Sequence, residues 1–456
     1  MQREKLGTRL GFILLSAGCA IGIGNVWKFP WMVGQNGGAI FVLIYFAFLA
    51  LLGIPVLVME FSLGRASQKS PVKLYQQLEK PGTKWHWHGY LALAGNYLLM
   101  MFYTTVAAWM IQYVGITAKG DFVGADANKV ANIFTNVKSN AIMMSIFVIL
   151  TVIVGFAVCA IGLQKGLERI TKVMMLALLA LIVILAVNSI FLDGAKDGLK
   201  FYLLPNVDAM KEIGVVKVIV SAMNQAFFTL SLGIGSMAIF GSYLDKDRAL
   251  LGEAVNVAVL DTFVAVTSGL IIFPACSSFG VDVTAGPDLI FKTLPPVFNS
   301  LAGGRIWGTL FFVFMTFAAL STVFAVFENI ISCFMDLTGW SRKKTCLINA
   351  IIMSVLALPC VLGFSTLDFI KPFGEGSNIM DLEDFIVSNI MLPLGSLIFI
   401  LFCVNKKYGW GFENFLNEAN QGKGLKVQKW MKGYMTYILP LMVLTILVIG
   451  LIDYFN

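Results

Sequence analysis

Charged residues are scarce in this chain. Only 13% of its 456 residues are Asp, Glu, Lys or Arg, whereas soluble domains carry about 25%. Hydrophobic residues make up 58% of the chain, and the mean hydropathy is +0.82. The shortage of charge excludes an ordinary soluble globular protein, and it gives no basis for nucleic-acid binding. We therefore expect a protein embedded in membrane lipid.

Other features are also sparse or missing. The seven cysteines lie in or beside apolar segments without paired extracellular spacing, so free thiols are expected. The start "MQREKLGTRL" leads directly into an apolar run, and no cleavable signal peptide is expected. The only two histidines, His86 and His88, fall in one connecting segment, and no nucleophile or metal cluster of an intramembrane enzyme is evident. The sequence therefore predicts a protein that is not an enzyme.

Long hydrophobic runs recur along the whole chain, and each is long enough to cross a bilayer. We expect eleven transmembrane helices at about 9–33, 38–66, 89–118, 139–161, 168–193, 213–243, 250–276, 305–335, 345–364, 382–404 and 431–454. Most Lys and Arg residues fall in the N-terminal tail and the odd-numbered connections. The positive-inside rule then predicts a multi-pass protein of the cell membrane, with a cytoplasmic N-terminus and an outside C-terminus. No linker divides the chain, so residues 1–456 are expected to form one transmembrane domain.

Two of the expected spans are interrupted by glycine. The first contains "AGCAIGIGNVWKFP" (17–30), and the sixth contains "TLSLGIGS" (229–236). They begin two groups of five spans, at about 9–193 and 213–404, with an extra helix at about 431–454. Because five is odd, the second group must be inverted relative to the first, and paired interruptions of this kind mark the central site of transporters. The predicted fold is an all-α integral membrane protein, a 5+5 inverted repeat with helices 1 and 6 broken.

A break in a membrane helix frees backbone groups that need polar partners. The carbonyl end of the first half-helix suits a cation, and the amide end of the second half suits a carboxylate. Breaks are expected around residues 20–24 and 231–235, with Asn25 adding a side-chain oxygen. The alternative at this point is that the glycines only allow close helix packing.

Sparse polar residues in other spans favour the breaks. Asp261 lies in the apolar stretch "AVLDTFVAV", Thr229 lies at the sixth-span interruption, and Ser321 and Thr322 lie in "FAALSTVFA". An acidic residue inside a span indicates function. Oxygen ligands without His or Cys suit a hard ion such as Na⁺. Glu60 is a candidate partner for amides freed at a break.

With these motifs in place, the chain resembles the neurotransmitter:sodium symporter family, and in particular its bacterial amino acid transporters of the leucine-transporter fold. The matching segments are "TRLGFILLSAGCAIGIGNVWKFP", "NGGAIFVLIYF", "GIPVLVMEFSLGR", "NQAFFTLSLGIGS", "FAALSTVFAVFE" and "DFIVSNIMLPLG". They extend over nearly the whole length. Eleven spans in place of twelve also resemble many bacterial members.

The resemblance implies two sodium sites. The first would use the Ala20 carbonyl with Asn25, Thr229 and Asp261, completed by the substrate carboxylate. The second would combine three carbonyls with two hydroxyls, from Gly18, Ile21, Ala318, Ser321 and Thr322.

The resemblance also implies a substrate site. Amides of Ile23 and Gly24 with the Tyr103 hydroxyl would hold the carboxylate. The ammonium group would meet carbonyls near the breaks, from Ala20, Phe228, Thr229 and the Ser231 region. Glycine at Gly22, where monoamine transporters carry aspartate, resembles the amino acid transporters. The implied side-chain pocket is apolar and uncharged, and consists of Leu99, Phe228, Ile234, Val326 and Phe324.

Anion dependence and gating follow from the same comparison. Chloride-dependent relatives carry serine at the position of Ala265, and Asp261 supplies a fixed charge to the first cation, so no chloride site is expected. Lys28 and Asp384 would pair above the site, with Gln225 contributing to closure. Arg3 and Asp336 would form the inner gate.

The predicted function is sodium-coupled symport of neutral hydrophobic amino acids, aliphatic or aromatic, by alternating access and without chloride. Two alternatives stay open, a broken-helix transporter of another small zwitterion and an amino-acid-gated ion channel. The expected partners are the amino acid, Na⁺ and membrane lipid. The preferred amino acid, the sodium stoichiometry, proton counter-transport and the oligomeric state are not specified by the sequence.

Overall fold

The computed structural model describes residues 4–280, 289–299 and 302–455. Within these ranges the secondary structure is helical and contains no β-strand. The described residues include nine helices long and apolar enough to cross a membrane, or ten if one bent pair of helices counts as a single span. The chain is therefore an all-helical protein with the helix lengths of a multi-pass membrane protein.

The membrane-length helices are continuous, carry a short π-helical segment, labelled η, or in one case are interrupted at a single turn residue, Ala357. They are α3–η2–α4 (Ala39–Phe48, Leu49–Gly53, Ile54–Ser67), α6 (Trp87–Lys119), α8 (Ala141–Ala160), η3–α9 (Leu163–Glu168, Arg169–Ile190), α14 (Leu250–Ser278), α16 (Gly304–Thr338), α17–α18 (Arg342–Leu356, Leu358–Leu362), α19–η5–α20 (Ile379–Phe385, Ile386–Met391, Leu392–Val404) and α22–η6–α23 (Met431–Gly433, Tyr434–Ile438, Leu439–Phe455). Seven shorter elements mostly lie at the two ends of the molecule. They are α5 (Pro71–Leu78), α7 (Ala127–Ser139), α10 (Ala195–Leu203), α11 (Val207–Ile213), η4 (Leu289–Thr293), α15 (Leu294–Asn299) and α21 (Phe412–Ala419).

The bent pair lies at the N-terminal end of the chain. It joins α1 (Arg9–Ala20) to η1–α2 (Gly24–Lys28, Phe29–Gln35), and the two parts meet at 57°. The Thr8 hydroxyl caps α1 by accepting from the Gly11 amide, and the Glu168 carboxylate accepts from the Gly7 and Thr8 amides. These contacts fix where α1 begins, and the glycine-rich residues 21–24 let it end in the interior of the protein.

A second interruption separates α12 (Val215–Phe228) from α13 (Ser236–Gly241). The connecting residues include three with positive φ, Ser231 (+51°), Gly233 (+98°) and Gly235 (+75°). A Cβ atom at Gly233 would lie 2.1 Å from the Leu392 carbonyl oxygen, so only glycine fits there. The predicted span 213–243 is thus divided into two short helices joined by non-helical backbone.

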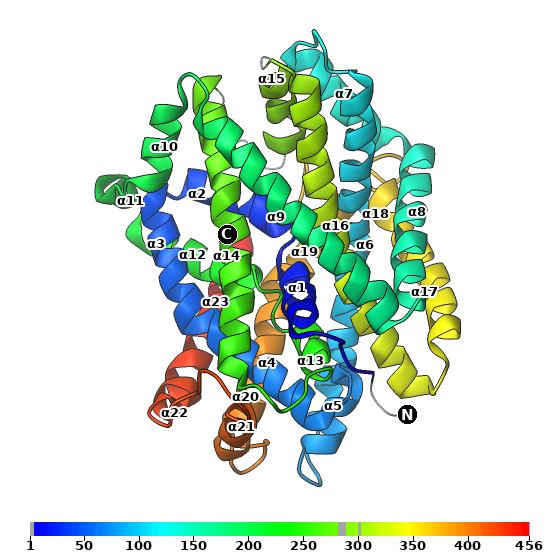
Figure 1. The fold of residues 1–456 in the computed structure, drawn as a ribbon, viewed down its shortest axis with the longest axis vertical. Helices are drawn as coiled ribbons and strands as arrows, with labels where there is room; N and C mark the ends of the chain where they lie inside the picture. The colour runs from blue at the N-terminus through cyan, green and yellow to red at the C-terminus, as the bar shows by residue number, and fades with distance from the viewer. Residues whose placement is uncertain (1–3, 281–288, 300–301, 456) are drawn as a thin grey trace.

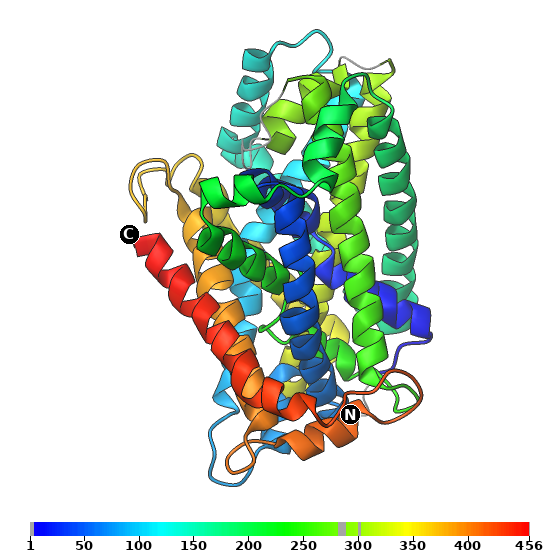
Figure 2. The same ribbon diagram turned by 90° about the vertical axis from the view of Figure 1, so that its left-hand side faces the viewer.

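The long helices α16 and α6 pack along each other through the middle of the molecule (Figure 1). The N-terminal segment, α5 and α21 gather at one end, while α7, α10 and α15 lie at the opposite end. The last helix, α23, runs obliquely along the side and packs on α20 (Figure 2). All seven cysteines are free and buried, which confirms the expectation of free thiols.

Candidate ion and substrate site

A buried cluster of three polar side chains lies beside the bend after α1. The Asn25 amide donates to Asp261 Oδ1 (2.7 Å) and to Thr229 Oγ1 (3.2 Å), and Thr229 Oγ1 donates to Asp261 Oδ2 (2.8 Å). The three side chains are at most 2% exposed, and they come from η1, from the residue after α12 and from α14. Buried polar groups of this kind need partners. The bend and the second interruption therefore meet at this cluster, which we call the Asp261 cluster.

The backbone at the bend completes the surroundings of the Asp261 cluster. The Gly22 amide donates to Asn25 Oδ1 (3.1 Å), so the side-chain amide of Asn25 is held at both its oxygen and its nitrogen. Ala20, expected to contribute a carbonyl here, ends α1 and lines a small cavity together with Asn25 and Thr229. The four residues predicted for the first sodium site are thus brought to one place.

A second group of oxygens lies between α1 and α16. Ser321 Oγ is 3.4 Å from the Ile21 carbonyl oxygen and 2.9 Å from that of Ala318. Thr322 Oγ1 lies 3.3 Å from the carbonyl oxygens of Gly18 and Ile21, and 3.5 Å from that of Ala318. Three carbonyls and two hydroxyls therefore face one another, and several of the separations are long for O–H···O bonds. Oxygen-only surroundings fit a hard cation such as Na⁺.

In the part of the chain that the structure describes, acidic, histidine and cysteine side chains do not gather in the way a transition-metal site requires. Among the described residues, no group of three or more His, Cys, Asp and Glu is placed to hold a metal ion. His86 contacts Glu79 through Nδ1 (2.6 Å), whereas His88 is buried and contacts the Tyr75 hydroxyl (2.7 Å). The two histidines thus have different partners.

Small residues and a tyrosine shape the space next to the bend. The Ile23 amide donates to the Tyr103 hydroxyl (3.1 Å). A Cβ atom at Gly22 would lie 2.4 Å from that hydroxyl oxygen and 2.8 Å from Thr322 Oγ1, and one at Gly24 would lie 3.0 Å from the Phe228 ring. Glycine at both positions lets backbone and side-chain polar groups approach one another.

Two neighbouring cavities reach this region. The inner cavity, about 30 Å³, is lined by residues of the bend and by Leu99, Tyr103, Phe228, Ser231 and Ile234. The outer cavity, which we call the vestibule, has a volume of about 300 Å³ and shares Gly24, Leu99, Tyr103 and Phe228 with the inner one.

The expected side-chain pocket is only partly reproduced. Leu99, Phe228 and Ile234 line the inner cavity, and Leu392, which was not predicted, lines it too. Val326 and Phe324 are buried on α16 and line neither of the two cavities. Their apolar character gave no information on the direction in which each side chain points.

The outer gate residues face one space without forming an ion pair. Lys28 and Asp384 both line the vestibule, but Lys28 Nζ lies 3.8 Å from the centroid of the Phe228 ring. Asp384 Oδ1 instead accepts from the Ser388 hydroxyl (2.7 Å). A lysine side chain carries a single ammonium group, so it does not also reach the Asp384 carboxylate while that group lies over the Phe228 ring. Gln225 is buried on α12 and lines neither of these cavities.

The predicted inner gate falls partly outside the described residues, because Arg3 belongs to the undescribed start of the chain. Asp336 accepts from the Ser70 amide (2.8 Å), which ties the end of α16 to the start of α5.

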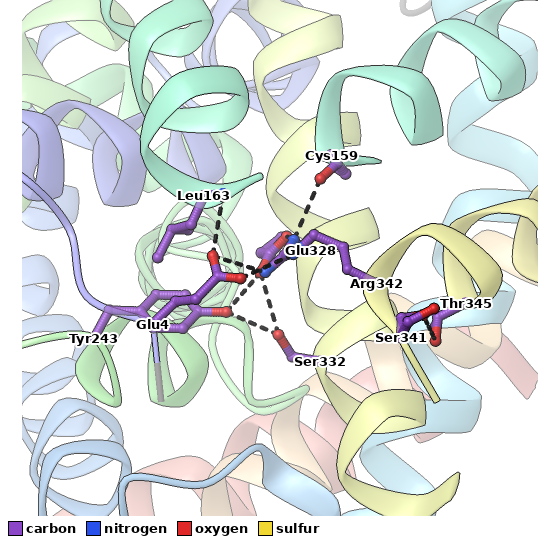
Figure 3. A network of polar contacts seen from close by, with 9 residues as sticks. All are labelled: Glu4, Cys159, Leu163, Tyr243, Glu328, Ser332, Ser341, Arg342 and Thr345. Carbon is purple, nitrogen blue, oxygen red and sulfur yellow. Dashed lines mark hydrogen bonds and ion pairs between the residues drawn. The ribbon is translucent and has the colours of Figure 1, made fainter. Parts of the chain in front are cut away.

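A larger polar network surrounds Glu328 on α16 (Figure 3). Arg342 donates to both oxygens of Glu328, at 2.6 and 3.0 Å, and also to Glu4, whose Oε2 accepts from the Leu163 amide. The Tyr243 hydroxyl donates to Glu328 Oε1 (2.6 Å) and contacts Ser332 (2.8 Å). This network, named here the Glu328 network, joins the N-terminal segment to α16, α17 and the segment after α13. It was not predicted, although Glu328 in an apolar span was a visible signal.

Further polar residues hold the second interruption. Glu60 Oε1 accepts from the Gly233 amide (2.6 Å), which confirms the expected contact between Glu60 and an amide freed at a break. Asn96 and Asn329 were not predicted, and both donate to the Ile234 carbonyl. The signal available for them was an amide side chain inside an apolar stretch, in "LAGNYLLMM" and "FENIIS".

Comparison with known proteins fits this geometry. The model of the sodium:neurotransmitter symporter family matches residues 3–133 and 127–456. The uncharacterized sodium-dependent transporter YhdH of Bacillus subtilis is 35% identical over 399 residues, covering 87% of this chain and 86% of the relative. An uncharacterized sodium-dependent transporter of Methanocaldococcus jannaschii is 30% identical over 98% of this chain and 90% of its own length. A crystal structure of MhsT in complex with L-phenylalanine has a TM-score of 0.87 and 37% identity, covering 98% of this chain and 100% of that one.

Helices of membrane length, oxygen clusters at a bent helix and these relatives together define a sodium-dependent transporter, and not an enzyme. The chain belongs to the sodium:neurotransmitter symporter family.

Proposed function

We propose that this protein is a symporter that couples Na⁺ to the uptake of neutral hydrophobic amino acids, independently of chloride and by alternating access. The observation that carries the proposal is the convergence of oxygen atoms from α1 and α16 beside the Asp261 cluster. The complex of MhsT with L-phenylalanine supports an amino acid with an apolar side chain as the substrate class.

The proposed first sodium site consists of Ala20, Asn25, Thr229 and Asp261. Asp261 brings a negative charge into hydrogen-bonding distance of Asn25 and Thr229, and Ala265, one turn further along α14, offers no polar group. A fixed carboxylate beside the cation removes the need for a mobile anion, because it supplies the same compensating charge. This arrangement supports chloride independence.

The proposed second sodium site consists of the oxygens of Gly18, Ile21, Ala318, Ser321 and Thr322. Because these oxygens come from both α1 and α16, a cation held by them would tie the two helices together. Sodium and substrate would then stabilise the same arrangement, and by linkage each raises the affinity for the other.

The proposed substrate site lies between the Asp261 cluster and the vestibule. The amides of Ile23 and Gly24, with the Tyr103 hydroxyl, would receive the carboxylate, because the amide end of a helix favours an anion. The side chain would lie against Leu99, Phe228 and Ile234, which carry no charge. Ser231 Oγ lies 3.3 Å from the Cys19 carbonyl oxygen, on the side proposed for the ammonium group.

At the level of the whole chain, we propose one domain with eleven spans, made of inverted repeats at about 9–193 and 213–404 and an added helix at about 431–454. The two interruptions, after α1 and after α12, begin the two repeats. The proposed location is the cell membrane, with the N-terminus cytoplasmic and the C-terminus outside, from the distribution of Lys and Arg.

The test is equilibrium binding of radiolabelled amino acid to the purified protein, with competition by the twenty amino acids in media with and without Na⁺ and Cl⁻. We expect binding that requires Na⁺, ignores Cl⁻ and is displaced best by neutral apolar amino acids. Thr322→Val, which removes one oxygen of the second sodium site, should raise the half-saturating Na⁺ concentration by about tenfold.

Thr151→Val is the matched control, since the Thr151 hydroxyl is buried on α8 and donates to the Phe147 carbonyl of its own helix (2.8 Å). Equal amino acid binding in choline and sodium media would refute the proposal. The same holds if Thr151→Val and Thr322→Val shift the Na⁺ dependence equally.

A further inference from the structure

The backbone between α12 and α13 is held at one carbonyl by two asparagines from different helices. Asn96 Nδ2 on α6 donates to the Ile234 carbonyl (2.8 Å), and Asn329 Nδ2 on α16 donates to the same oxygen (3.3 Å). Asn329 also donates to Asn96 Oδ1 (3.0 Å), and the Ser236 hydroxyl donates to the same atom (3.3 Å). We call these three side chains, of Asn96, Asn329 and Ser236, the asparagine clamp.

The asparagine clamp is buried and well satisfied. Asn96, Asn329 and Ser236 are at most 1% exposed. Each side-chain amide makes more than one contact, since Asn96 Nδ2 also donates to the Ala92 carbonyl (2.7 Å) of its own helix. A buried carbonyl outside a helix needs a donor, and two side-chain donors on one oxygen restrict its position strongly.

The clamped residue lies between two glycines that give the chain freedom to move. Gly233 and Gly235 both have positive φ, and Ile234 between them is 1% exposed. On the other side, Glu60 accepts from the Gly233 amide. The backbone at residues 233–235 is thus flexible by composition and is fixed by side chains of other helices.

The Ile234 side chain forms part of the wall of the inner cavity. That cavity has a volume of about 30 Å³, so a large side chain is admitted only if the wall moves. Gly95, on α6 next to Asn96, lies directly against the Ile234 side chain, because a Cβ atom there would lie 3.1 Å from Ile234 Cγ2 and 3.2 Å from Met391 Cε. The space available to a substrate therefore depends on where Ile234 is held.

We propose that the asparagine clamp and Gly95 set the size of the amino acid side chain that the protein accepts, by fixing Ile234 at the end of the inner cavity. This inference rests on the proposed function, the transport of neutral amino acids. The four residues act as positioning residues, because they reach the substrate only through Ile234. Weakening the clamp allows Ile234 to withdraw, and adding a methyl group at Gly95 presses Ile234 toward the cavity.

The test compares two substitutions that act in opposite directions. Binding of radiolabelled amino acid in sodium medium is competed with alanine, valine, leucine, phenylalanine and tryptophan. With Asn329→Ala, we expect the affinity for tryptophan relative to valine to rise by about five- to tenfold, which corresponds to one lost hydrogen bond. With Gly95→Ala, we expect the same ratio to fall by a similar factor. The affinity for alanine, whose methyl group is too short to reach Ile234, should change less in both variants.

Two further variants keep the test decisive. Ser236→Ala removes a single donor from the clamp and should shift the tryptophan-to-valine affinity ratio in the same direction as Asn329→Ala. This smaller substitution replaces Asn329→Ala in the test if the Asn329→Ala protein does not fold. Asn36→Ala is the matched control, since Asn36 is a buried asparagine at the end of α2 whose side-chain amide donates to the Met32 carbonyl (2.8 Å) of its own helix. The control should leave the tryptophan-to-valine ratio at the wild-type value.

Some results would overturn this inference while leaving the proposed function intact. They are an equal loss of affinity for all five amino acids, or a shift of the ratio in the same direction by Gly95→Ala and the clamp variants. A wild-type protein that binds no amino acid in sodium medium would instead overturn the proposed function, and this inference with it.

Discussion

Gly22 shows how strongly a single residue is constrained at the bend. Its missing side chain leaves room for the Tyr103 hydroxyl and for Thr322, one of which belongs to the proposed substrate site and the other to the proposed second sodium site. An added methyl group would displace one or both, and overpacking of this kind costs about 1–3 kcal/mol.

We therefore expect Gly22→Ala to lower the affinity for substrate by about tenfold or more, because the Ile23–Tyr103 hydrogen bond is disturbed. Gly115→Ala is the control, since, apart from its chain neighbours and the backbone of its own helix, no atom of the described residues lies within 4 Å of a Cβ atom at that position on α6. Substrate titrations and melting temperatures of both variants provide the measurement. Normal affinity in Gly22→Ala would mean that Tyr103 has no part in binding.

Asp261 is the second residue whose chemistry leads to a prediction. In Asp261→Asn the size of the side chain is kept and the charge is lost. We expect the half-saturating Na⁺ concentration to rise by about ten- to a hundredfold, as for loss of a charged partner. Added chloride should recover part of that loss by supplying the missing negative charge. Unchanged Na⁺ dependence of substrate binding would show that Asp261 does not act on a cation.

At the scale of single residues, the sequence indicated which residues come together better than it indicated where each side chain points. The hydroxyl, amide and carboxylate groups of both proposed sodium sites belong to polar residues that stand out in apolar spans, and the structure brings them together, while their binding of Na⁺ stays a prediction. The expected ion pair between Lys28 and Asp384 is not formed, because a lysine beside an open cavity has several orientations of similar energy. In the structure its ammonium group lies over Phe228.

At the scale of helices, the Glu328 network links the start of the chain to two consecutive helices, α16 and α17, that lie more than 300 residues later. Arg342 begins α17, Glu328 lies on α16, and Glu4 precedes α1 (Figure 3). Glu328 is fully buried and the Arg342 side chain is 12% exposed, so removing one partner leaves a buried charge unpaired. The network therefore holds the start of the chain against the ends of two membrane helices.

We expect Glu328→Gln to destabilise the protein by about 3–5 kcal/mol, as for other broken buried pairs. Glu375→Gln is the matched control, because Glu375 forms an exposed i,i+4 pair with Lys371 and such pairs contribute only about 0.3–0.5 kcal/mol. Thermal unfolding in detergent, followed for both variants, gives the comparison. If the two variants melt at the same temperature, the Glu328 network does not carry the stability assigned to it.

The helices themselves were largely predictable, and their junctions were not. Long apolar runs fixed the positions of the membrane-length helices, and glycine clusters indicated where α1 and α12 end. The asparagine clamp escaped prediction because it joins residues 96, 236 and 329, and helical periodicity gives no pairing between distant helices. The basic side chain of Arg342 indicated only that this residue belongs to a connection at the membrane surface. It gave no information on its partners, Glu328 and Glu4.

At the scale of the whole molecule, the two interruptions lie together although about 200 residues separate them in sequence. Asn25 follows the first, Thr229 begins the second, and a hydrogen bond joins them, with Asp261 of α14 as their common partner. A cation bound here would contact both proposed repeats at once. This is how binding of an ion is expected to bias the arrangement of the entire helix bundle.

Uptake by liposomes containing the purified protein tests the coupling of sodium to amino acid most directly. Accumulation of a labelled hydrophobic amino acid is compared under inward gradients of sodium chloride, sodium gluconate and choline chloride. We predict equal, concentrative uptake in both sodium media and none above equilibrium in choline, because only an inward sodium gradient supplies the free energy for accumulation and chloride takes no part in the coupling. Accumulation in choline chloride that equals uptake in sodium chloride would contradict the account.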